Sequence, residues 1–445
     1  MRIRWMAWIC GSMLLSTGVS RSNDWPQWLG EKRDSVWRET GILEKFPAGG
    51  PPVRWRVPVG GGYSGPAVAE GRVFLTDRQL TPGAANAKDP FQRGEITGSE
   101  RVLCFEERSG KILWQHGYSC PYTVSYPAGP RATPTVDGDR VYTLGAEGDL
   151  FCFVAASGKV LWSRDLKKDY QIQAPLWGFA GHPLVDGDKL LCLVGGEGSV
   201  AVAFNKMNGK ELWRALSSKE PGYCPPTIIE AGGKRQLILW HGESINSLDP
   251  ETGKVYWTEP WKLNFALSIP TPRQSGNLLF LTAFYNGSHL LRLSADKPEA
   301  ELIWKSRKTS EKDTEKLHSI MSSPLIEEGY IYGVCSYGQL RCLKLSDGER
   351  VWETFQATTG DKPERWANAF LIKQGSRFFL ANEKGDLIIA NLSPKGYEEL
   401  SRCHLVDPTG DATGRPIVWS HPAFANRCVY ARNDRELVCL DLRAP

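Results

Sequence analysis

A short motif that ends in tryptophan recurs along most of the chain. Ser109–Trp114 reads Ser-Gly-Lys-Ile-Leu-Trp, and Ser157–Trp162 repeats it with one change. Further copies are Asn208–Trp213, Thr252–Trp257 and Asp347–Trp352, and Glu301–Trp304 keeps the Trp after a Pro-containing turn. Consecutive copies lie 44 to 51 residues apart. A repeat of this period indicates a solenoid, a propeller or another array of similar units.

Each repeat unit is expected to contain four strands. In the unit that ends at Trp162, the runs 133–136, 140–144 and 150–154 precede the strand that carries the Trp. The turns between them contain Asp137-Gly138-Asp139, Gly148 and Ser157-Gly158. Asp-Gly pairs between apolar runs are typical of tight hairpins. Four antiparallel strands in about 45 residues correspond to one propeller blade.

The number of units predicts a closed ring of eight blades. Six units end at the Trp residues from Trp114 to Trp352, and a seventh ends near Leu400. The last unit, 421–445, has only three strands, and the missing strand with its Trp is found at 53–57. We therefore expect an all-β, eight-bladed propeller of four-stranded antiparallel blades in which the N-terminal strand completes the last blade. The tryptophans expected to dock between blades are Trp55, Trp114, Trp162, Trp213, Trp257, Trp304 and Trp352.

The N-terminus is typical of a secretory signal peptide. Met1–Arg4 is basic, an interrupted apolar stretch runs from Trp5 to Val19, and small residues place cleavage after Ser20. We predict a signal peptide at 1–20, a leader segment at 21–50 and the propeller at 51–445. No later apolar run has the length of a membrane span, so the mature chain is expected to be exported, to the periplasm or the cell exterior, without an integral membrane segment. With 54 basic and 50 acidic residues, the chain carries no charge excess that would suggest nucleic acid as a partner.

The Gly-Lys-x-x-Trp motif resembles the tryptophan-docking motif of the pyrroloquinoline-quinone (PQQ) repeat family, and the resemblance covers 51–445. That family contains PQQ-dependent dehydrogenases and non-catalytic propellers, among them the outer-membrane assembly scaffold BamB. The dehydrogenases often carry adjacent cysteines or a Cys-x-x-Cys-His haem motif, and this sequence has neither. Their calcium ligands and catalytic Asp match no motif here. The resemblance therefore favours a BamB-like scaffold without cofactor; the alternative is a PQQ-dependent dehydrogenase or a quinone-binding relative, holding PQQ with Ca²⁺.

The connections that lead into the innermost strands are the candidate functional region, because in a propeller they open onto one face around the axis. His182 and His421 each precede the Pro that begins such a strand, and Asn368 has a related position. The residues expected at this mouth are Tyr63, Arg131, Trp177, Phe179, His182, Tyr223, His318, Trp366, Asn368, Trp419 and His421. Aromatic and His side chains that converge on a concave surface suit a ligand or a partner's loop.

Several interpretations of this mouth stay open. The aromatic residues are able to cap the channel while the His side chains bond to backbone carbonyls, which is a purely structural role. A protein or peptide site is the functional alternative that we favour, ahead of a small-molecule or metal site. A hydrolase or lyase that uses the His residues is a third possibility, and a convergent acidic and His cluster would support it.

Two further features have structural consequences. Cys104, Cys152 and Cys342 each stand ten residues before a repeated Trp, and Cys439 has the matching position in the last blade, which indicates a small buried site. Pairing of Cys428 with Cys439, or of Cys335 with Cys342, stays open in an exported chain. The segment between Asp77 and Arg101 interrupts the first blade and is expected to form a long surface loop, which is either functional, as long loops often are, or a disordered decoration of the blade.

Overall fold

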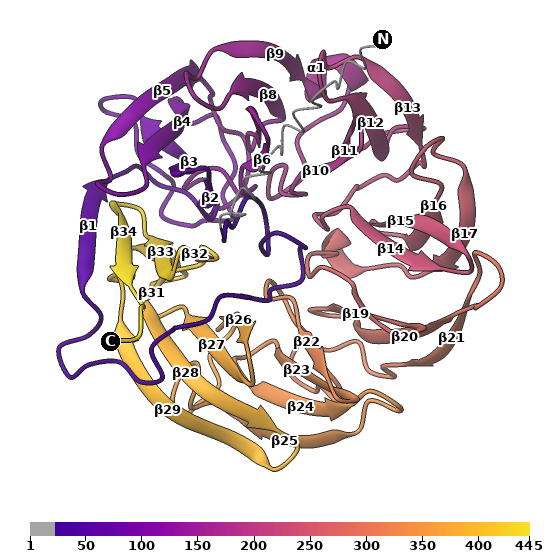
Figure 1. Cartoon of the computed structure of the whole chain (residues 1–445). Helices are drawn as coiled ribbons and strands as arrows, with labels where there is room; N and C mark the ends of the chain where they lie inside the picture. The colour runs from indigo at the N-terminus through magenta and orange to yellow at the C-terminus, as the bar shows by residue number, and fades with distance from the viewer. Residues whose placement is uncertain (1–22) are drawn as a thin grey trace, which may run out of the picture.

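Eight four-stranded sheets surround a central axis in the computed structural model, which describes residues 23–445 (Figure 1). The predicted eight-bladed propeller is therefore confirmed. The signal peptide predicted at 1–20 lies outside the described residues. The described residues contain very little helix, and their one α-helix is α1 (Leu166–Tyr170). No helix in this part of the chain is long and apolar enough to cross a membrane.

In seven of the eight blades the strands follow one another in sequence from the axis outward. The first four blades comprise β2 (Ala67–Ala69), β3 (Arg72–Leu80), β4 (Gly98–Glu106) and β5 (Ile112–Ser119); β6 (Thr135–Asp137), β7 (Arg140–Leu144), β8 (Asp149–Val154) and β9 (Val160–Asp165); β10 (Leu184–Asp186), β11 (Lys189–Leu193), β12 (Ala201–Asn205) and β13 (Glu211–Ala215); and β14 (Thr227–Ala231), β15 (Lys234–Trp240), β16 (Ser244–Leu248) and β17 (Val255–Pro260).

The next three blades comprise β18 (Arg273–Ser275), β19 (Leu278–Ala283), β20 (Gly287–Leu293) and β21 (Ala300–Lys305); β22 (Leu325–Glu327), β23 (Tyr330–Val334), β24 (Leu340–Lys344) and β25 (Arg350–Thr354); and β26 (Ala369–Gln374), β27 (Arg377–Asn382), β28 (Asp386–Ser393) and β29 (Gly396–His404). A separate hairpin, β30 (Gly410–Ala412) with β31 (Arg415–Ile417), precedes the last blade, and a 3₁₀ turn, η1 (Asn264–Ala266), precedes the fifth.

The last blade joins the two ends of the chain. Its sheet has the order β1 (Val53–Pro58), β34 (Glu436–Asp441), β33 (Cys428–Arg432) and β32 (Ala423–Ala425). In the antiparallel β1–β34 pair, Trp55 lies opposite Cys439. The N-terminal strand therefore supplies the outer strand of the last blade, as predicted, and this pairing removes the open edge that β34 would otherwise present.

The repeated motif forms a contact between neighbouring blades. The indole nitrogen of Trp114 in the first blade donates a hydrogen bond to the carbonyl of Ala155 in the second, at 2.8 Å. Gly158 lies against the same ring, where a Cβ atom would stand 2.5 Å from the indole, and its φ of 70° also favours glycine. The Trp is thus matched to the Gly of the next unit. Trp257 differs and donates to Gln236 within its own blade, because the following unit has a Pro-containing turn instead of the Gly turn.

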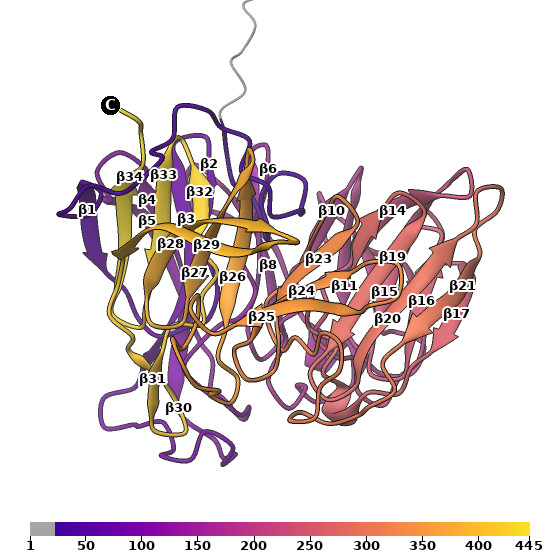
Figure 2. The same ribbon diagram turned by 90° about the horizontal axis from the view of Figure 1, so that it is seen from below.

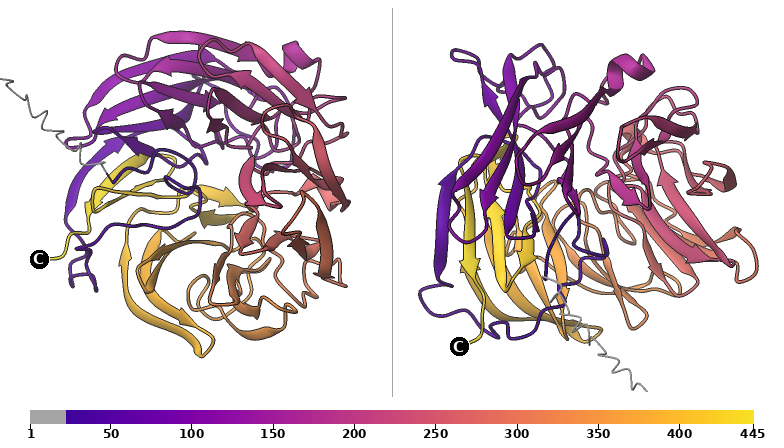
Figure 3. Two further views of the ribbon diagram at one scale, coloured as in Figure 1. Left: turned by 45° about the vertical axis from the view of Figure 1, so that its right-hand side comes forward. Right: turned by 45° about the horizontal axis from the view of Figure 1, so that its top comes forward.

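The leader segment crosses the hub of the ring (Figure 1). Trp25 and Val68 pair in an antiparallel bridge, Val36 and Lys373 pair in a parallel one, and Trp37 is almost fully buried. We call residues 23–46 the strap. Figure 2 shows the strap on one face of the ring and the β30–β31 hairpin on the opposite face, and Figure 3 shows the strap passing over the inner strands. One end of the axial channel is therefore covered by the chain itself.

The insertion in the first blade is partly strand, which corrects the expected loop. β3 and β4 pair without interruption from Arg72 opposite Glu106 to Leu80 opposite Gly98, so that only 81–97 remain a loop. The buried charged side chains of this hairpin have polar partners. Asp77 forms an ion pair with Arg101 at 2.6 Å, and the Arg78 guanidinium donates a hydrogen bond to the carbonyl of Ile96 at 2.8 Å. These ionic and hydrogen-bonded contacts stabilise strand residues that look too polar for a buried hairpin.

All ten cysteines in the described part of the chain are free and buried. Cys104, Cys152 and Cys342 lie directly opposite Trp114, Trp162 and Trp352 on the adjacent strand. This repeated position is a small buried site beside the inter-blade Trp, in agreement with the sequence pattern.

Candidate functional site

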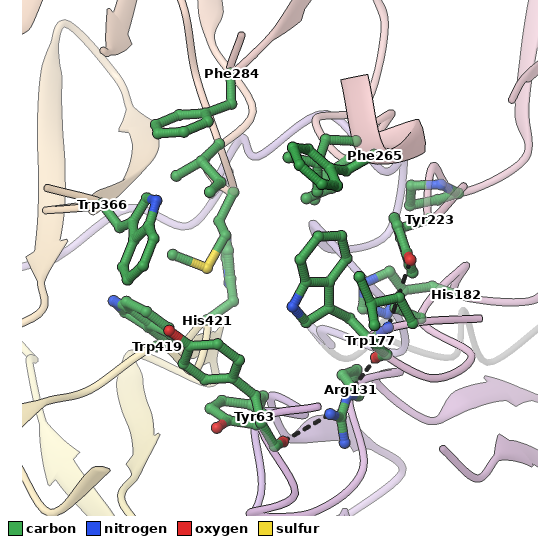
Figure 4. A pocket seen from close by; sticks show the side chains of 18 of the residues that line it. Tyr63, Arg131, Trp177, His182, Tyr223, Phe265, Phe284, Trp366, Trp419 and His421 are labelled. Carbon is green, nitrogen blue, oxygen red and sulfur yellow. Dashed lines mark hydrogen bonds between the residues drawn. The ribbon is translucent and has the colours of Figure 1, made fainter. Parts of the chain in front are cut away.

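A cavity of about 300 Å³ lies on the axis where the connections into the inner strands converge (Figure 4). Eight of the eleven residues predicted at the mouth line it: Tyr63, Arg131, Trp177, His182, Tyr223, Trp366, Trp419 and His421. These residues come from connections that are up to 358 positions apart in sequence. The propeller therefore brings together most of the side chains that the repeat pattern placed at one end of the ring.

The other three predicted residues lie behind the wall. Phe179 is buried against Gly148, where a Cβ atom would stand 2.8 Å from its ring. His318 is fully buried and its Nδ1 lies 3.2 Å from the carbonyl of Phe284. Asn368 is buried and its carbonyl accepts a hydrogen bond from the Glu383 amide. Position in a connection therefore does not by itself turn a side chain toward the axis.

Several lining residues were not predicted. Trp28 comes from the strap, Phe91 from the 81–97 loop, and Phe284 and Tyr285 from the turn between β19 and β20. Phe265 lies in the connection that leads into the innermost strand of the fifth blade. Choosing residues from this connection, as was done for the other blades, would have found it. The remaining members of the lining are Tyr126, Leu176, Ala180, Pro225, Leu267, Ile269, Ile320, Met321, Arg365 and Phe370.

Aromatic rings form most of the wall and contact one another around it. Tyr126 lies between Trp419, at a ring distance of 5.8 Å, and Phe91, at 5.2 Å. On the other side, Trp177 contacts Tyr223 at 5.8 Å. Figure 4 shows Trp366 and Trp419 on one side of the cavity and Trp177 and Phe265 on the other. Such ring contacts fix the shape of the cavity in the absence of any ligand.

Three wall aromatics have unusual backbone conformations. Tyr126, Phe265 and Trp366 have φ values of 54°, 55° and 64°. The left-handed region is unfavourable for bulky residues, and strain of this kind costs roughly 1–3 kcal/mol per residue. Strained residues gather at functional sites more than elsewhere in proteins. Other residues with positive φ lie elsewhere in the described chain, so these three support the choice of this cavity as the candidate site without deciding it.

The strap closes the inner end of the cavity. The Trp28 ring is stacked on His182 with ring centroids 4.0 Å apart, and it meets His421 edge-on at 5.0 Å. Its indole nitrogen donates to the Thr271 hydroxyl at 3.0 Å. Arg33, also in the strap, donates to the carbonyl of His182 at 3.1 Å. The floor is therefore held by contacts with two separate blades, and the cavity opens only at the opposite end.

The His residues of the floor are engaged by the backbone. His182 Nδ1 accepts a hydrogen bond from the Thr133 amide at 2.8 Å, and His421 Nδ1 lies 2.6 Å from the carbonyl of Pro422. Burial lowers the pKa of His421 to about 4 and that of His182 well below its usual value. Both rings are therefore neutral near pH 7, and no Asp or Glu is among the described residues that line the cavity. The arrangement lacks the paired groups of acid–base or nucleophilic catalysis.

The two arginines of the lining are already occupied. Arg131 donates to the carbonyls of Trp177, Ser125 and Tyr126 at 2.7 to 2.8 Å. Arg365 pairs with Glu311 at 2.6 Å, and its guanidinium lies 4.4 Å from the ring centre of Trp366. Both guanidinium groups thus have partners within the protein, backbone carbonyls for Arg131 and Glu311 for Arg365, and both support the aromatic wall.

The sequence pattern of one family, described as outer membrane protein assembly factor BamB, matches residues 98–354, 197–402 and 241–445. Together these matches cover 98–445, more than half of the chain. The chain belongs to this PQQ-repeat family. A curated relative, the BamB of Yersinia pestis, is 23% identical over 207 residues, which are 44% of this chain and 49% of that protein. The chain thus matches about half the length of this relative.

Solved structures of two kinds share the fold. BamB from Moraxella catarrhalis has a TM-score of 0.53 with 14% identity, covering 82% of this chain and 99% of that one. Quinohemoprotein alcohol dehydrogenase from Comamonas testosteroni has a TM-score of 0.60 with 12% identity, covering 96% of this chain and 82% of that one. At these identities the likeness concerns the fold alone, which both classes share.

The residues of the cavity do not fit PQQ with Ca²⁺. PQQ carries three carboxylates, and Ca²⁺ takes six to eight oxygen ligands, commonly from Asp, Glu and Asn. The described lining offers no carboxylate or side-chain amide, and its two guanidinium groups are engaged as above. Within residues 23–445 no group of three His, Cys, Asp or Glu side chains is arranged to hold a metal ion.

Proposed function

We propose that this protein is an exported, non-catalytic scaffold of the BamB type, which binds protein partners at the open end of the axial cavity and acts in outer-membrane protein assembly. The observation that carries the proposal is the wall of the cavity. It is aromatic, it is closed at one end by the strap, and its His and Arg side chains are bonded within the protein. Such a surface binds apolar groups and supplies no reacting group.

Family membership supports the same function, because the matched family is described by the name of an assembly factor. Location in the periplasm is part of the proposal and rests on the signal peptide predicted from the sequence. The expectation that the partners are proteins rests on membership in this family, and the partner itself is to be identified by experiment.

Deletion of the gene in the source organism tests the proposed function. We expect the amount of folded outer-membrane barrel proteins, measured by heat-modifiable mobility in gels, to fall at least twofold, and expression of the intact chain to restore it. Messenger RNA levels of the same barrels serve as the control for indirect effects. Unchanged amounts of folded barrels in the deletion strain would contradict the proposal.

A PQQ-dependent dehydrogenase, or a relative that still binds a quinone, is the second candidate. The observation in its favour is the likeness in fold to the quinohemoprotein alcohol dehydrogenase, which extends over 96% of the chain. We place it second because the lining of the cavity offers no ligand set for Ca²⁺ or for three carboxylates.

A further inference from the structure

The cavity admits an occupant from one side only. Trp28 and the two His rings below it close the inner end, and Arg33 fixes the strap that carries Trp28 to the third blade. A polypeptide cannot pass through the ring along this axis. Any group that binds must enter and leave by the open end, and must itself have an end or a side chain to insert.

The chemistry of the wall selects a neutral, apolar occupant. Apart from Arg131, Arg365, His182 and His421, the lining side chains are aromatic, aliphatic, Met or Pro. The N–H groups of Arg131 are shared among backbone carbonyls, and Arg365 is neutralised by Glu311. A cationic group would lose its hydration without meeting any carboxylate in the lining, which is unfavourable in a desolvated site. A sugar would leave most of its hydroxyls without hydrogen bonds for the same reason.

The apolar surface continues beyond the cavity. Phe265 has 63% of its surface exposed and Phe91 has 41%, although both also contribute to the lining. A ligand enclosed by the cavity would leave these two rings in water. An apolar group attached to a larger molecule covers them as well, because the atoms on either side of the inserted group lie over the rim.

The conformation of Phe265 supports a role for the exposed ring. Its φ of 55° is unfavourable for a bulky residue, and glycine would adopt it without strain. Its aromatic contacts are an edge-on one with Trp177 at 6.5 Å and a tilted one with Tyr285 at 5.6 Å. An exposed aromatic ring on a strained backbone contributes little to folding, and its position at the rim of the cavity suits a role in binding.

Two lining residues also carry a buried polar atom that has no hydrogen-bond partner among the described residues, Tyr126 Oη and His421 Nε2. Both atoms are themselves enclosed by protein, the His421 ring lying against Trp25, Trp28 and Phe370, so they do not decide which group enters the cavity. The aromatic wall favours an aromatic occupant, because rings pack on one another offset or edge-on and bury more apolar surface than aliphatic side chains do. Tryptophan, which has the largest aromatic side chain, is thus the residue that matches the cavity best.

We propose that the axial cavity is a receptor for one aromatic side chain, tryptophan above all, presented by an exposed segment of a protein partner whose flanking residues lie on Phe91 and Phe265. This inference rests on the proposed function in that the partner is a protein. It adds which side chain of the partner is recognised and which residues of this chain recognise it.

Calorimetric titration of the purified chain with short peptides tests the inference. The probes are acetyl-Ser-Val-Trp-Val-Ser-amide, the same peptide with Ala in place of Trp, and free N-acetyltryptophanamide. We expect the Trp peptide to bind with a stoichiometry of one and at least tenfold more tightly than either other probe. The Ala peptide lacks the ring, and the free amide lacks the groups that cover the rim.

Two substitutions connect the binding to the cavity. Phe265→Gly removes the exposed ring and also relieves the unfavourable φ, so the thermal midpoint should not fall while the Trp peptide binds at least tenfold more weakly. Ala180→Trp fills the cavity and should abolish binding. Met207→Gly is the matched control, because Met207 is also exposed, at 49%, in a turn after β12 away from the cavity. It should change the affinity less than twofold.

Equal binding of the Trp and Ala peptides would overturn the inference, as would unaltered affinity in Phe265→Gly. Binding of N-acetyltryptophanamide as tight as that of the peptide would also overturn it, because the site would then serve a small molecule. None of these results depends on the deletion strain. Loss of folded barrels in that strain without binding of the peptide would leave the scaffold function standing and remove only this inference.

Discussion

At the scale of single residues, the ring is held by the contact between each repeated Trp and the next blade. Trp162 illustrates it: its indole nitrogen donates to the carbonyl of Lys206 at 3.0 Å, and Gly209 lies so close that a Cβ atom would stand 2.7 Å from the ring. The ring is 9% exposed and packs between the second and third blades. The contact buries the apolar surface of the indole and also gives its buried N–H a carbonyl partner within the protein.

We predict that Trp162→Ala lowers the free energy of unfolding by about 3–5 kcal/mol, as truncation of a large buried aromatic residue does. Leu161→Ala is the control, because the neighbouring side chain is 37% exposed and its loss should cost about 0.5 kcal/mol. Urea denaturation followed by Trp fluorescence and by circular dichroism measures both. Equal midpoints for the two variants would show that the inter-blade contact does not stabilise the ring.

The buried His residues predict a dependence of stability on pH. Burial lowers the pKa of His421 and of His318 to about 4, below the ordinary value of 6.5 that an unfolded chain shows. The unfolded state therefore binds protons that the folded state does not between pH 6.5 and 4. The contribution of these residues to stability is complete above pH 6.5 and is lost as the pH falls toward 4.

We expect the thermal midpoint of the wild-type chain to fall between pH 7 and pH 5 by more than that of His421→Gln, which removes one of the buried His side chains whose pKa is lowered. The difference between the two proteins isolates His421 from all other groups that titrate in this range. Parallel curves for wild type and variant would contradict the proposed neutral state of the ring.

At the scale of elements, the N-terminal region has two separable roles. The strap covers the hub with Trp25, Trp28 and Trp37, and β1 completes the last blade by pairing with β34. The strap adds buried surface to a ring that is already closed, whereas β1 closes it. Removal of each part should therefore have a different result.

We predict that deletion of residues 23–46 lowers the thermal midpoint but leaves a monomer that unfolds cooperatively. Deletion of residues 23–58, which also removes β1, should yield aggregated or unfolded protein, because the edge of β34 is then open. Size-exclusion chromatography and circular dichroism distinguish these states. A folded monomer from the longer deletion would show that the N-terminal strand is not needed for closure.

At the scale of the whole molecule, the chain has a fold that it shares with both BamB and a quinohemoprotein alcohol dehydrogenase, so that the fold does not separate the two classes. A titration of the mature chain with PQQ and Ca²⁺, followed by desalting, measures this directly. We expect no retained quinone absorbance, because the cavity lining lacks the required ligands. An apo quinoprotein dehydrogenase treated in the same way provides the positive control. Stoichiometric retention would move the protein into the quinoprotein class.

The sequence by itself determined the ring. The Gly-x-x-x-Trp spacing, the Asp-Gly turns and the three-stranded last unit predicted the blades and their closure by residues 53–57, because each of these signals acts between neighbours in the chain or between adjacent blades. The same regularity predicted which connections open at the axis, and eight of the eleven residues chosen from them line the cavity.

Only the tertiary structure decided which side chains meet there. Phe179 turns away because Gly148 leaves room for its ring between blades, and Trp28 reaches the axis because the strap crosses the hub. The 81–97 loop brings Phe91 over the rim from the first blade. These placements depend on contacts between segments far apart in sequence that no local pattern encodes. The closed floor and the aromatic wall, on which the proposed function rests, therefore become visible only when all eight blades and the strap are in place.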